Sequence, residues 1–162
     1  MAILAPNDTW GDPIQSWDYS APVANVDFIN LGDYRELLII GESVGSDTGA
    51  TSALTLLTST NNGSSFASTG YVNIGGSSVA LVLLTGAVAT ATPQGFIIQA
   101  FNLNAASYKT RFLTSAGTEG SATAAATRIG QKSAEVNNAL RFAWTSAANF
   151  ATGSIRVYGK RG

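Results

Sequence analysis

The sequence predicts an all-β protein, an antiparallel β-sandwich of jelly-roll type with about eight to ten short strands and an extended N-terminal arm. Three observations predict this fold class. Apolar and polar residues alternate over short segments, turn residues separate these segments, and no segment has the apolar spacing of a long helix. The sequence also contains no internal repeat of about 20–50 residues, which argues against a propeller or a solenoid. Its 162 residues fit one sandwich domain.

The clearest strands lie near the C-terminus, within residues 140–159. Two segments flank a turn of small residues, and apolar residues take alternate positions in each, namely Leu140, Phe142 and Trp144, then Ile155 and Val157. We expect a C-terminal antiparallel hairpin with these side chains buried and with Arg141 and Arg156 outside. A two-stranded hairpin needs a second sheet to cover its apolar face, so most of the upstream chain is expected to supply that cover.

The same alternation predicts further strands along the chain, in residues 26–30, 34–44, 52–60, 68–76, 95–103 and 107–116. Residues 102–106 are expected to join the last two as a hairpin. Within 107–116 the alternation predicts two faces, one with Tyr108, Thr110, Phe112 and Thr114 and the other with Lys109, Arg111 and Leu113. Residues 79–88 fit either a strand or a short helix, and the small-residue run 121–131 is expected to be a strand because threonines and glycines interrupt its alanines.

Residues 1–24 predict an extended arm, distinct from a sandwich domain of residues 25–162. The arm carries three of the four prolines, which disfavour a regular helix. It also carries Trp10, Trp17 and Tyr19, large aromatic side chains that need a surface to pack on. Two alternatives follow. The arm folds back along its own sandwich, or it docks on a neighbouring subunit, in which case these three aromatics are the predicted assembly contacts.

The composition excludes several kinds of site. The chain has no cysteine and no histidine, so it lacks disulfides, thiolate metal sites and the commonest general base. Charged residues make up only 12% of the chain against about 25% in typical proteins. Nine Lys and Arg balance ten Asp and Glu, so no nucleic-acid or anionic-membrane partner is expected. No signal peptide and no membrane-spanning run is predicted, and no cofactor.

No constellation of residues predicts catalysis. Residues 59–66 resemble the Asp box of sialidases, with Asn61 in place of its aspartate, but that motif is a structural hairpin turn. The carboxylates show no spacing that selects a glycosidase pair, since Glu36 and Glu42 would lie about 20 Å apart on one strand. A Ca²⁺ site at Asp47 stays open, although no EF-hand spacing is present. We therefore expect a protein that is not an enzyme.

Three segments together carry a family resemblance. The series YRELLIIGESV, ALTLLTSTNNGSSF and the closing LRFAWTSAANFATGSIRVYG resembles small β-sandwich virion proteins of tailed bacteriophages. In those proteins a strand ends in a Ser-x-Asp-Gly-Gly-x-Thr-Phe-like turn, where this chain has Asn61 and Asn62 for Asp-Gly. The chain of those proteins closes with a Phe-x-x-Gly-x-Ile-x-Val/Leu-Tyr-Gly hairpin, matched here by Phe150, Gly153, Ile155, Val157, Tyr158 and Gly159.

The resemblance implies a structural, non-enzymatic subunit of a phage virion, made in the host cytoplasm, either a head decoration protein or a tail or fibre component. Its implied partners are other virion proteins, such as the major capsid or tail proteins, and copies of itself, with a trimer as the implied state. The alternative is a carbohydrate-binding module for a host surface glycan. In that alternative a platform of aromatic side chains would stack on sugar rings, namely Trp10, Trp17, Tyr19, Tyr34, Tyr71 and Tyr108.

Overall fold

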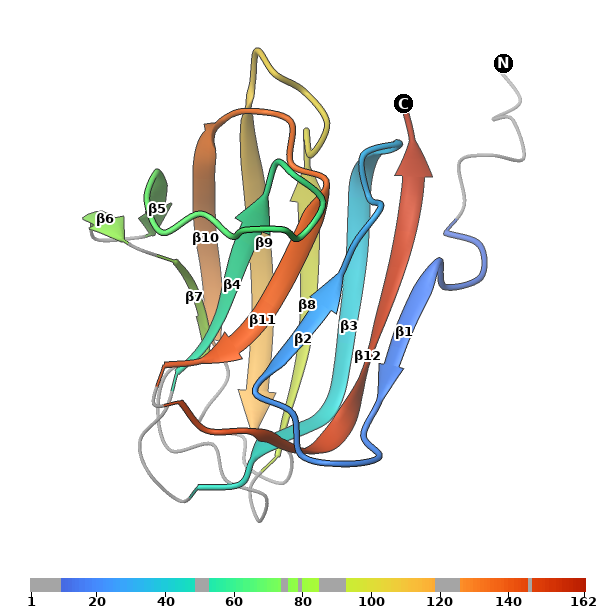
Figure 1. Ribbon diagram of the computed structural model, residues 1–162, viewed down its shortest axis with the longest axis vertical. Coiled ribbons are helices and arrows are strands. Elements are labelled where there is room, and N and C mark those ends of the chain that lie inside the picture. The colour runs from blue at the N-terminus through green and yellow to red at the C-terminus, as the bar shows by residue number, and fades with distance from the viewer. Residues whose placement is uncertain are drawn as a thin grey trace.

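The protein is a two-layered antiparallel β-sandwich (Figure 1). The computed structural model describes residues 10–48, 53–73, 76–78, 80–84, 93–118, 126–145 and 147–162. These residues form twelve strands and no helix: β1 (Gln15–Asp18), β2 (Asn25–Phe28), β3 (Tyr34–Ser46), β4 (Leu54–Ser59), β5 (Tyr71–Asn73), β6 (Gly76–Ser78), β7 (Leu81–Leu84), β8 (Gln94–Phe101), β9 (Lys109–Thr118), β10 (Ala126–Ala134), β11 (Ala139–Trp144) and β12 (Phe150–Arg161).

Two sheets of unequal width face each other. One has eight strands in the order β1-β12-β3-β8-β9-β10-β5-β6, and the other has four in the order β2-β11-β4-β7. Every paired strand in both sheets runs antiparallel to its neighbour. In Figure 1 the four-stranded sheet lies in front of the wider one. The predicted fold class, an all-β antiparallel sandwich, is confirmed.

The core lies between the sheets and is built from the inward positions of each strand. Phe142 on β11 packs edge-on against Phe28, with ring centroids 6.0 Å apart, and stacks on Phe96 of β8 at 5.8 Å. Gly41 on β3 makes room for this cluster, because a Cβ there would lie 2.3 Å from the Phe96 ring. Burial of such large aromatics supplies most of the hydrophobic stabilisation of a domain of this size.

The two C-terminal strands have the predicted faces but do not form the predicted hairpin. Arg141 alternates with buried side chains on β11, as Arg156 does on β12. However, β11 pairs with β2 and β4, whereas β12 pairs with β1 and β3 in the other sheet. The turn between them crosses from one layer to the other, and the backbone N–H of Phe150 bonds the carbonyl of Val23. The two strands therefore belong to opposite layers of the sandwich.

The aromatic N-terminal segment folds back along its own sandwich. Strand β1 pairs with β12, and the backbone N–H groups of Ile14 and Tyr19 bond carbonyl oxygens of β12. The Trp17 ring packs edge-on against Phe150 at 5.5 Å between centroids. Residues 14–23 thus follow the first of the two alternatives, and residues 1–9 lie outside the described residues.

The other predicted strands are present as β2, β3, β4, β5, β8 and β9. The predicted strand 68–76 is shorter in the structure, because residues 68–70 are bends and Gly76 begins β6, which pairs back on β5. Strands β8 and β9 form the predicted hairpin, and their inner faces carry Phe96, Ile98 and Phe112. The segment that fitted either a strand or a helix contains β7 over Leu81–Leu84, while residues 79 and 85–88 lie outside the described residues. Of the small-residue run, residues 126–131 belong to β10, and residues 121–125 lie outside the described residues.

Candidate functional site

The face of the eight-stranded sheet that points away from the core is rich in exposed apolar side chains. We call this surface the outer face; it is formed by the outward residues of β3, β8, β9, β10 and β5. Exposure of its apolar side chains runs from 37% at Phe101 to 52% at Ile129, with Val72, Ile97 and Leu113 between them. An antiparallel sheet with one free face normally carries polar residues there. Exposed apolar clusters of this kind mark interaction surfaces.

The strand register brings these residues together in rows across the sheet. Leu38, Gln99, Leu113 and Ile129 lie directly opposite one another on β3, β8, β9 and β10. Directly opposite pairs are about 5 Å apart, so Leu113 and Ile129 form one continuous apolar contact on the surface. One row along, Ile40 on β3 lies beside Ile97 on β8, which extends the apolar strip.

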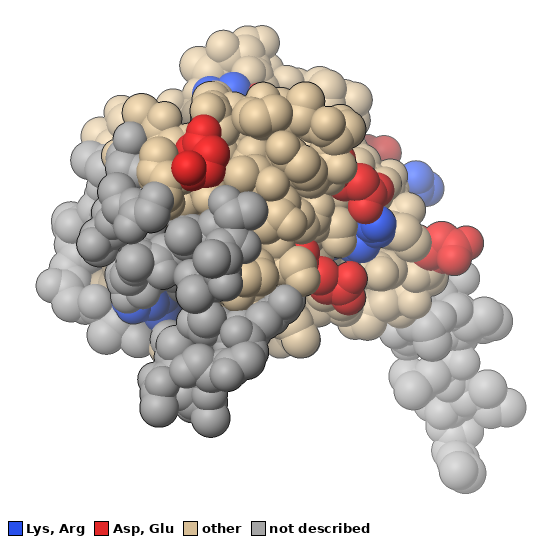
Figure 2. All heavy atoms as spheres, turned by 90° about the horizontal axis from the view of Figure 1, so that it is seen from below, with Lys and Arg blue, Asp and Glu red and all other residues tan. Residues whose placement is uncertain are grey.

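Three charged residues lie in the next row, and one of them is Lys160 on β12, the direct partner of Glu36. Glu36, Phe101 and Arg111 are consecutive partners on β3, β8 and β9, so the ring of Phe101 lies between an acid and a base. Among the described residues neither Glu36 nor Arg111 forms an ion pair, in contrast to Arg141 with Asp27. The face of the molecule in Figure 2 likewise shows charged groups in only a few places on a mostly uncharged surface.

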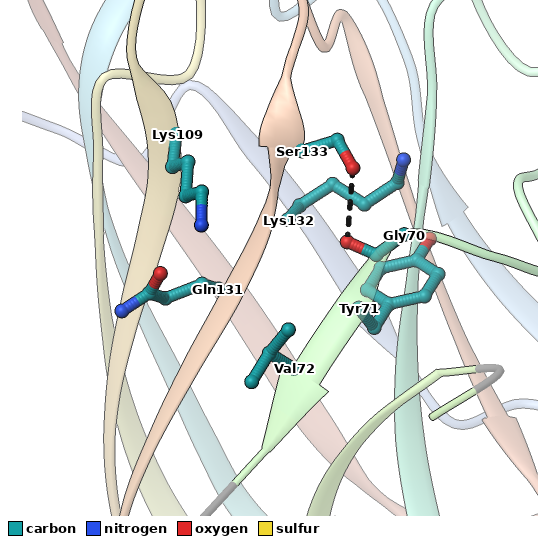
Figure 3. A pocket seen from close by; sticks show the side chains of 7 residues that line it. All are labelled: Gly70, Tyr71, Val72, Lys109, Gln131, Lys132 and Ser133. Carbon is teal, nitrogen blue, oxygen red and sulfur yellow. Dashed lines mark hydrogen bonds between the residues drawn. The ribbon is translucent and has the colours of Figure 1, made fainter. Parts of the chain in front are cut away.

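The edge of the outer face at β5 is fixed by side chains on both sides of β10 (Figure 3). Lys109, Gln131 and Val72 lie on the outer side of the sheet, whereas Lys132 turns inward toward Tyr71. Lys132 is 4% exposed, and its Nζ lies 2.5 Å from a Glu135 carboxylate oxygen and 5.2 Å from the Tyr71 ring centroid. These contacts anchor β5 and leave the inward lysine already partnered, so it is not a free catalytic base.

Tyr71 ties the same edge to the opposite sheet. Its hydroxyl accepts a hydrogen bond from the backbone N–H of Thr58 on β4 at 2.7 Å. Burial raises the pKa of Tyr71, because the ionised phenolate would lose its hydration. The phenol therefore stays neutral and serves as a structural link between β5 and β4.

The turn that resembles an Asp box has the structural role predicted for it. Asn61 Oδ1 accepts hydrogen bonds from the hydroxyl of Ser59 and from the backbone N–H of Ser65, and Gly63 adopts a φ of 87°. Asn62 forms hydrogen bonds with Asn30, and its backbone N–H donates to Asn138 Oδ1. The turn is thereby tied to the loop before β3 and to the loop before β11. These contacts hold the turn and its neighbouring loops in place.

The predicted assembly residues separate into two kinds. Trp10 and Tyr19 are exposed, at 36% and 39%, and remain available for contact. Trp17 is partly buried against Phe150 and is therefore a core residue. The three do not form one surface patch on a free arm, because β1 is hydrogen-bonded within the sheet.

The described acidic side chains do not gather into a metal centre. Within the part of the chain that the structure describes, no three acidic side chains converge in a way that could hold a metal ion. Asp47 accepts hydrogen bonds from the side-chain amide and the backbone N–H of Asn149, and these bonds lower the pKa of Asp47. Both oxygens of that carboxylate therefore have a partner in a loop-to-loop contact. The described part of the chain contains no helix with the length and hydropathy needed to span a bilayer.

The residues of the outer face were missed by the sequence-based site prediction, although a signal was present. Ile97, Leu113 and Ile129 occupy the outward phase of their strands, where a solvated antiparallel strand carries polar residues. Apolar residues in both phases of neighbouring strands are the pattern of a sheet covered on two sides.

Comparison with known proteins gives no family. No protein-family model and no curated protein matches the sequence. Among solved structures, one match is a protein of unknown function from Shewanella oneidensis MR-1, with 10% sequence identity and a TM-score of 0.26. The alignment covers 82% of this chain and 61% of that protein. A similarity this low carries no argument about either chain.

Proposed function

We propose that the chain is a non-enzymatic structural subunit of a tailed-bacteriophage virion that acts through protein–protein assembly. The observation that carries the assembly role is the apolar outer face of the eight-stranded sheet, with exposed side chains on β8, β9 and β10. When a partner covers such a surface, removal of its apolar area from water is favourable by about 25 cal/mol of free energy per Å². Only 12% of the residues are charged, so few charged groups would have to lose their hydration when a partner covers the surface.

The virion context comes from the resemblance of the turn at residues 59–66 and of the closing strand to phage sandwich proteins. Head decoration and tail or fibre roles both use a small sandwich as a building block, and the two differ in where the subunit sits on the particle. Other virion proteins, such as the capsid or tail proteins, are the proposed partners. Trp10 and Tyr19 are proposed as additional contacts, because both side chains are exposed beside β1.

Immunogold electron microscopy tests the virion role directly. Particles of the phage whose genome encodes the chain are labelled with antibody raised against the purified protein. Gold over the head supports a decoration protein, and gold along the tail or at its tip supports a tail or fibre component. Bare particles, with the antigen detected in the lysate, would contradict the virion proposal. Quenching of tryptophan emission by host polysaccharide would then favour the glycan-binding alternative.

A further inference from the structure

We infer that a second copy of this chain docks on the outer face, about a two-fold axis that runs parallel to β8. The inference rests on the proposed assembly role and names the partner of the surface that carries it. It follows from the strand register, because β8 lies between β3 and β9 and the residues of these three strands stand in defined rows.

The symmetry exchanges β3 with β9. A half-turn about an axis that lies along β8, between the two facing sheets, leaves each row opposite the same row of the second copy. Each residue of β3 then faces the β9 residue of its own row, and the contact is made twice, as in every isologous interface. Residues on β8 lie on the axis and face their own counterparts.

This exchange places apolar residues opposite apolar residues, and an acidic residue opposite a basic one. Leu38 faces Leu113 of the second copy, because both stand in the row of Gln99. Glu36 faces Arg111 of the second copy, because both flank Phe101. Complementary charge of this kind fixes the register of an interface.

Two of the four outward positions on the axis carry large apolar side chains. Ile97 and Phe101 lie on β8 and meet the same residues of the second copy, with Gln99 between them. Packed sheets keep their strands within about 30° of each other, so side chains from the two faces interdigitate along this line. A self-matched apolar axis with two flanking ion pairs favours a second copy over an unrelated protein.

The side of the sheet that carries the outer face is wide enough for a stable interface. Together with the flanking strands β12, β1 and β6, the outer face spans eight strands at about 4.8 Å spacing, and an average strand length of about eight residues at 3.3 Å each gives roughly 1,000 Å². A standard interface buries about 800 Å² on each partner. Most of the sheet would be covered, and the exposed apolar side chains of β8, β9 and β10 would lie inside the contact.

The axis makes a sharp test possible, because a residue on a two-fold axis meets itself. Ile97→Glu would oppose two carboxylates, and Ile97→Lys would oppose two ammonium groups. Like charges facing each other cost several kcal/mol, which corresponds to a dissociation constant weakened by about 100-fold or more. An equimolar mixture of the two variants would place Glu against Lys and restore pairing. Ile97 is 48% exposed, so both variants should fold.

The measurement is sedimentation velocity on the purified full chain, with near-ultraviolet circular dichroism as the check on folding. We expect the wild-type chain to sediment at twice its 16.7 kDa mass, each single variant as a monomer, and the mixture as a dimer. The control is Val136→Glu, because Val136 is 40% exposed on the loop between β10 and β11 and should leave the dimer intact.

Three results would overturn the docking: a wild-type monomer at high concentration, a trimer, or a mixture of the Ile97 variants that stays monomeric. These results are separable from the virion proposal. A dimer that depends on Ile97, together with bare particles in immunogold microscopy, would leave the two-fold interface standing and contradict the virion role. A wild-type monomer that still labels the particle would contradict the interface alone.

Discussion

Replacement of Arg141 tests how the four-stranded sheet is tied together on its solvent side. Arg141 on β11 donates from Nε and from Nη2 to the two carboxylate oxygens of Asp27 on β2, both at 2.7 Å. The carbon of its guanidinium group also lies 4.1 Å from the centroid of the Phe66 ring. The hydrogen bonds to Asp27 raise the pKa of Arg141, so the side chain is charged at every pH used in folding experiments. One residue thus joins β11, β2 and the turn after β4.

The expected cost of Arg141→Met is about 1–2 kcal/mol of unfolding free energy. An exposed ion pair contributes about 0.2–1 kcal/mol, and the two parallel hydrogen bonds place this one at the upper end. Stacking of the guanidinium on an aromatic ring at an exposed site adds about 0.5–1 kcal/mol. Solvent screening limits the total, because the two side chains of the pair remain 29% and 34% exposed. For a domain of this size the melting temperature should fall by about 2–8 °C.

Urea unfolding followed by tryptophan emission measures this cost, because Trp144 is buried at 5% exposure and reports loss of the core. Arg141→Lys keeps the charge but loses the fork geometry, and should recover less than half of the stability. A double-mutant cycle with Asp27→Asn isolates the pair and should give a coupling of about 0.5–1 kcal/mol. If Arg141→Met changed the unfolding free energy by less than about 0.3 kcal/mol, the reasoning from this contact would be refuted.

Three further predictions concern the core, the backbone and pH. Phe142→Ala should cost about 3–5 kcal/mol in urea unfolding, because it removes the ring that contacts both sheets. Gly153→Ala should cost about 1–3 kcal/mol in the same assay, because φ is 103° and the new Cβ would lie 2.6 Å from the Ser43 carbonyl oxygen. Stability should decline as pH rises above 10.0, the ordinary pKa of tyrosine, because the unfolded chain loses the Tyr71 proton before the folded one does. Urea titrations from pH 8 to 11 should show a smaller decline in Tyr71→Phe than in Tyr108→Phe.

The fold class and most strands could be predicted because period-two alternation is a local property of each segment. The inward faces of β2, β4, β8 and β9 follow directly from it. Strand pairing is not local, and this is why the C-terminal hairpin was wrong. A short turn between two strands is compatible with a hairpin or with a crossing between layers. The backbone N–H of Phe150 donates to the carbonyl of Val23, more than a hundred residues earlier, and this long-range bond accompanies the crossing between layers.

The same limit applies to the N-terminal segment. Proline and aromatic residues predict an extended chain, but extension is shared by a free arm and by an edge strand. What makes residues 15–18 an edge strand is the unpaired side of β12, which only the assembled sheet offers. Trp17 then gains burial against Phe150, whereas Trp10 and Tyr19 stay exposed.

The outer face could have been found by asking which strands are apolar in both phases. Residues 37–40 on β3 read Leu-Leu-Ile-Ile, and residues 96–98 on β8 read Phe-Ile-Ile. The core accounts for Leu37, Ile39, Phe96 and Ile98, but not for their outward neighbours. β-Strand propensity alone is a weak explanation for apolar β-branched residues at these outward positions, because threonine is also a strand former and is suited to a solvated face. The apolar outward residues also fall on the adjacent strands β3, β8, β9 and β10, which places them in one patch. Selection of strand formers would scatter such residues over every strand, whereas a covering partner requires them together.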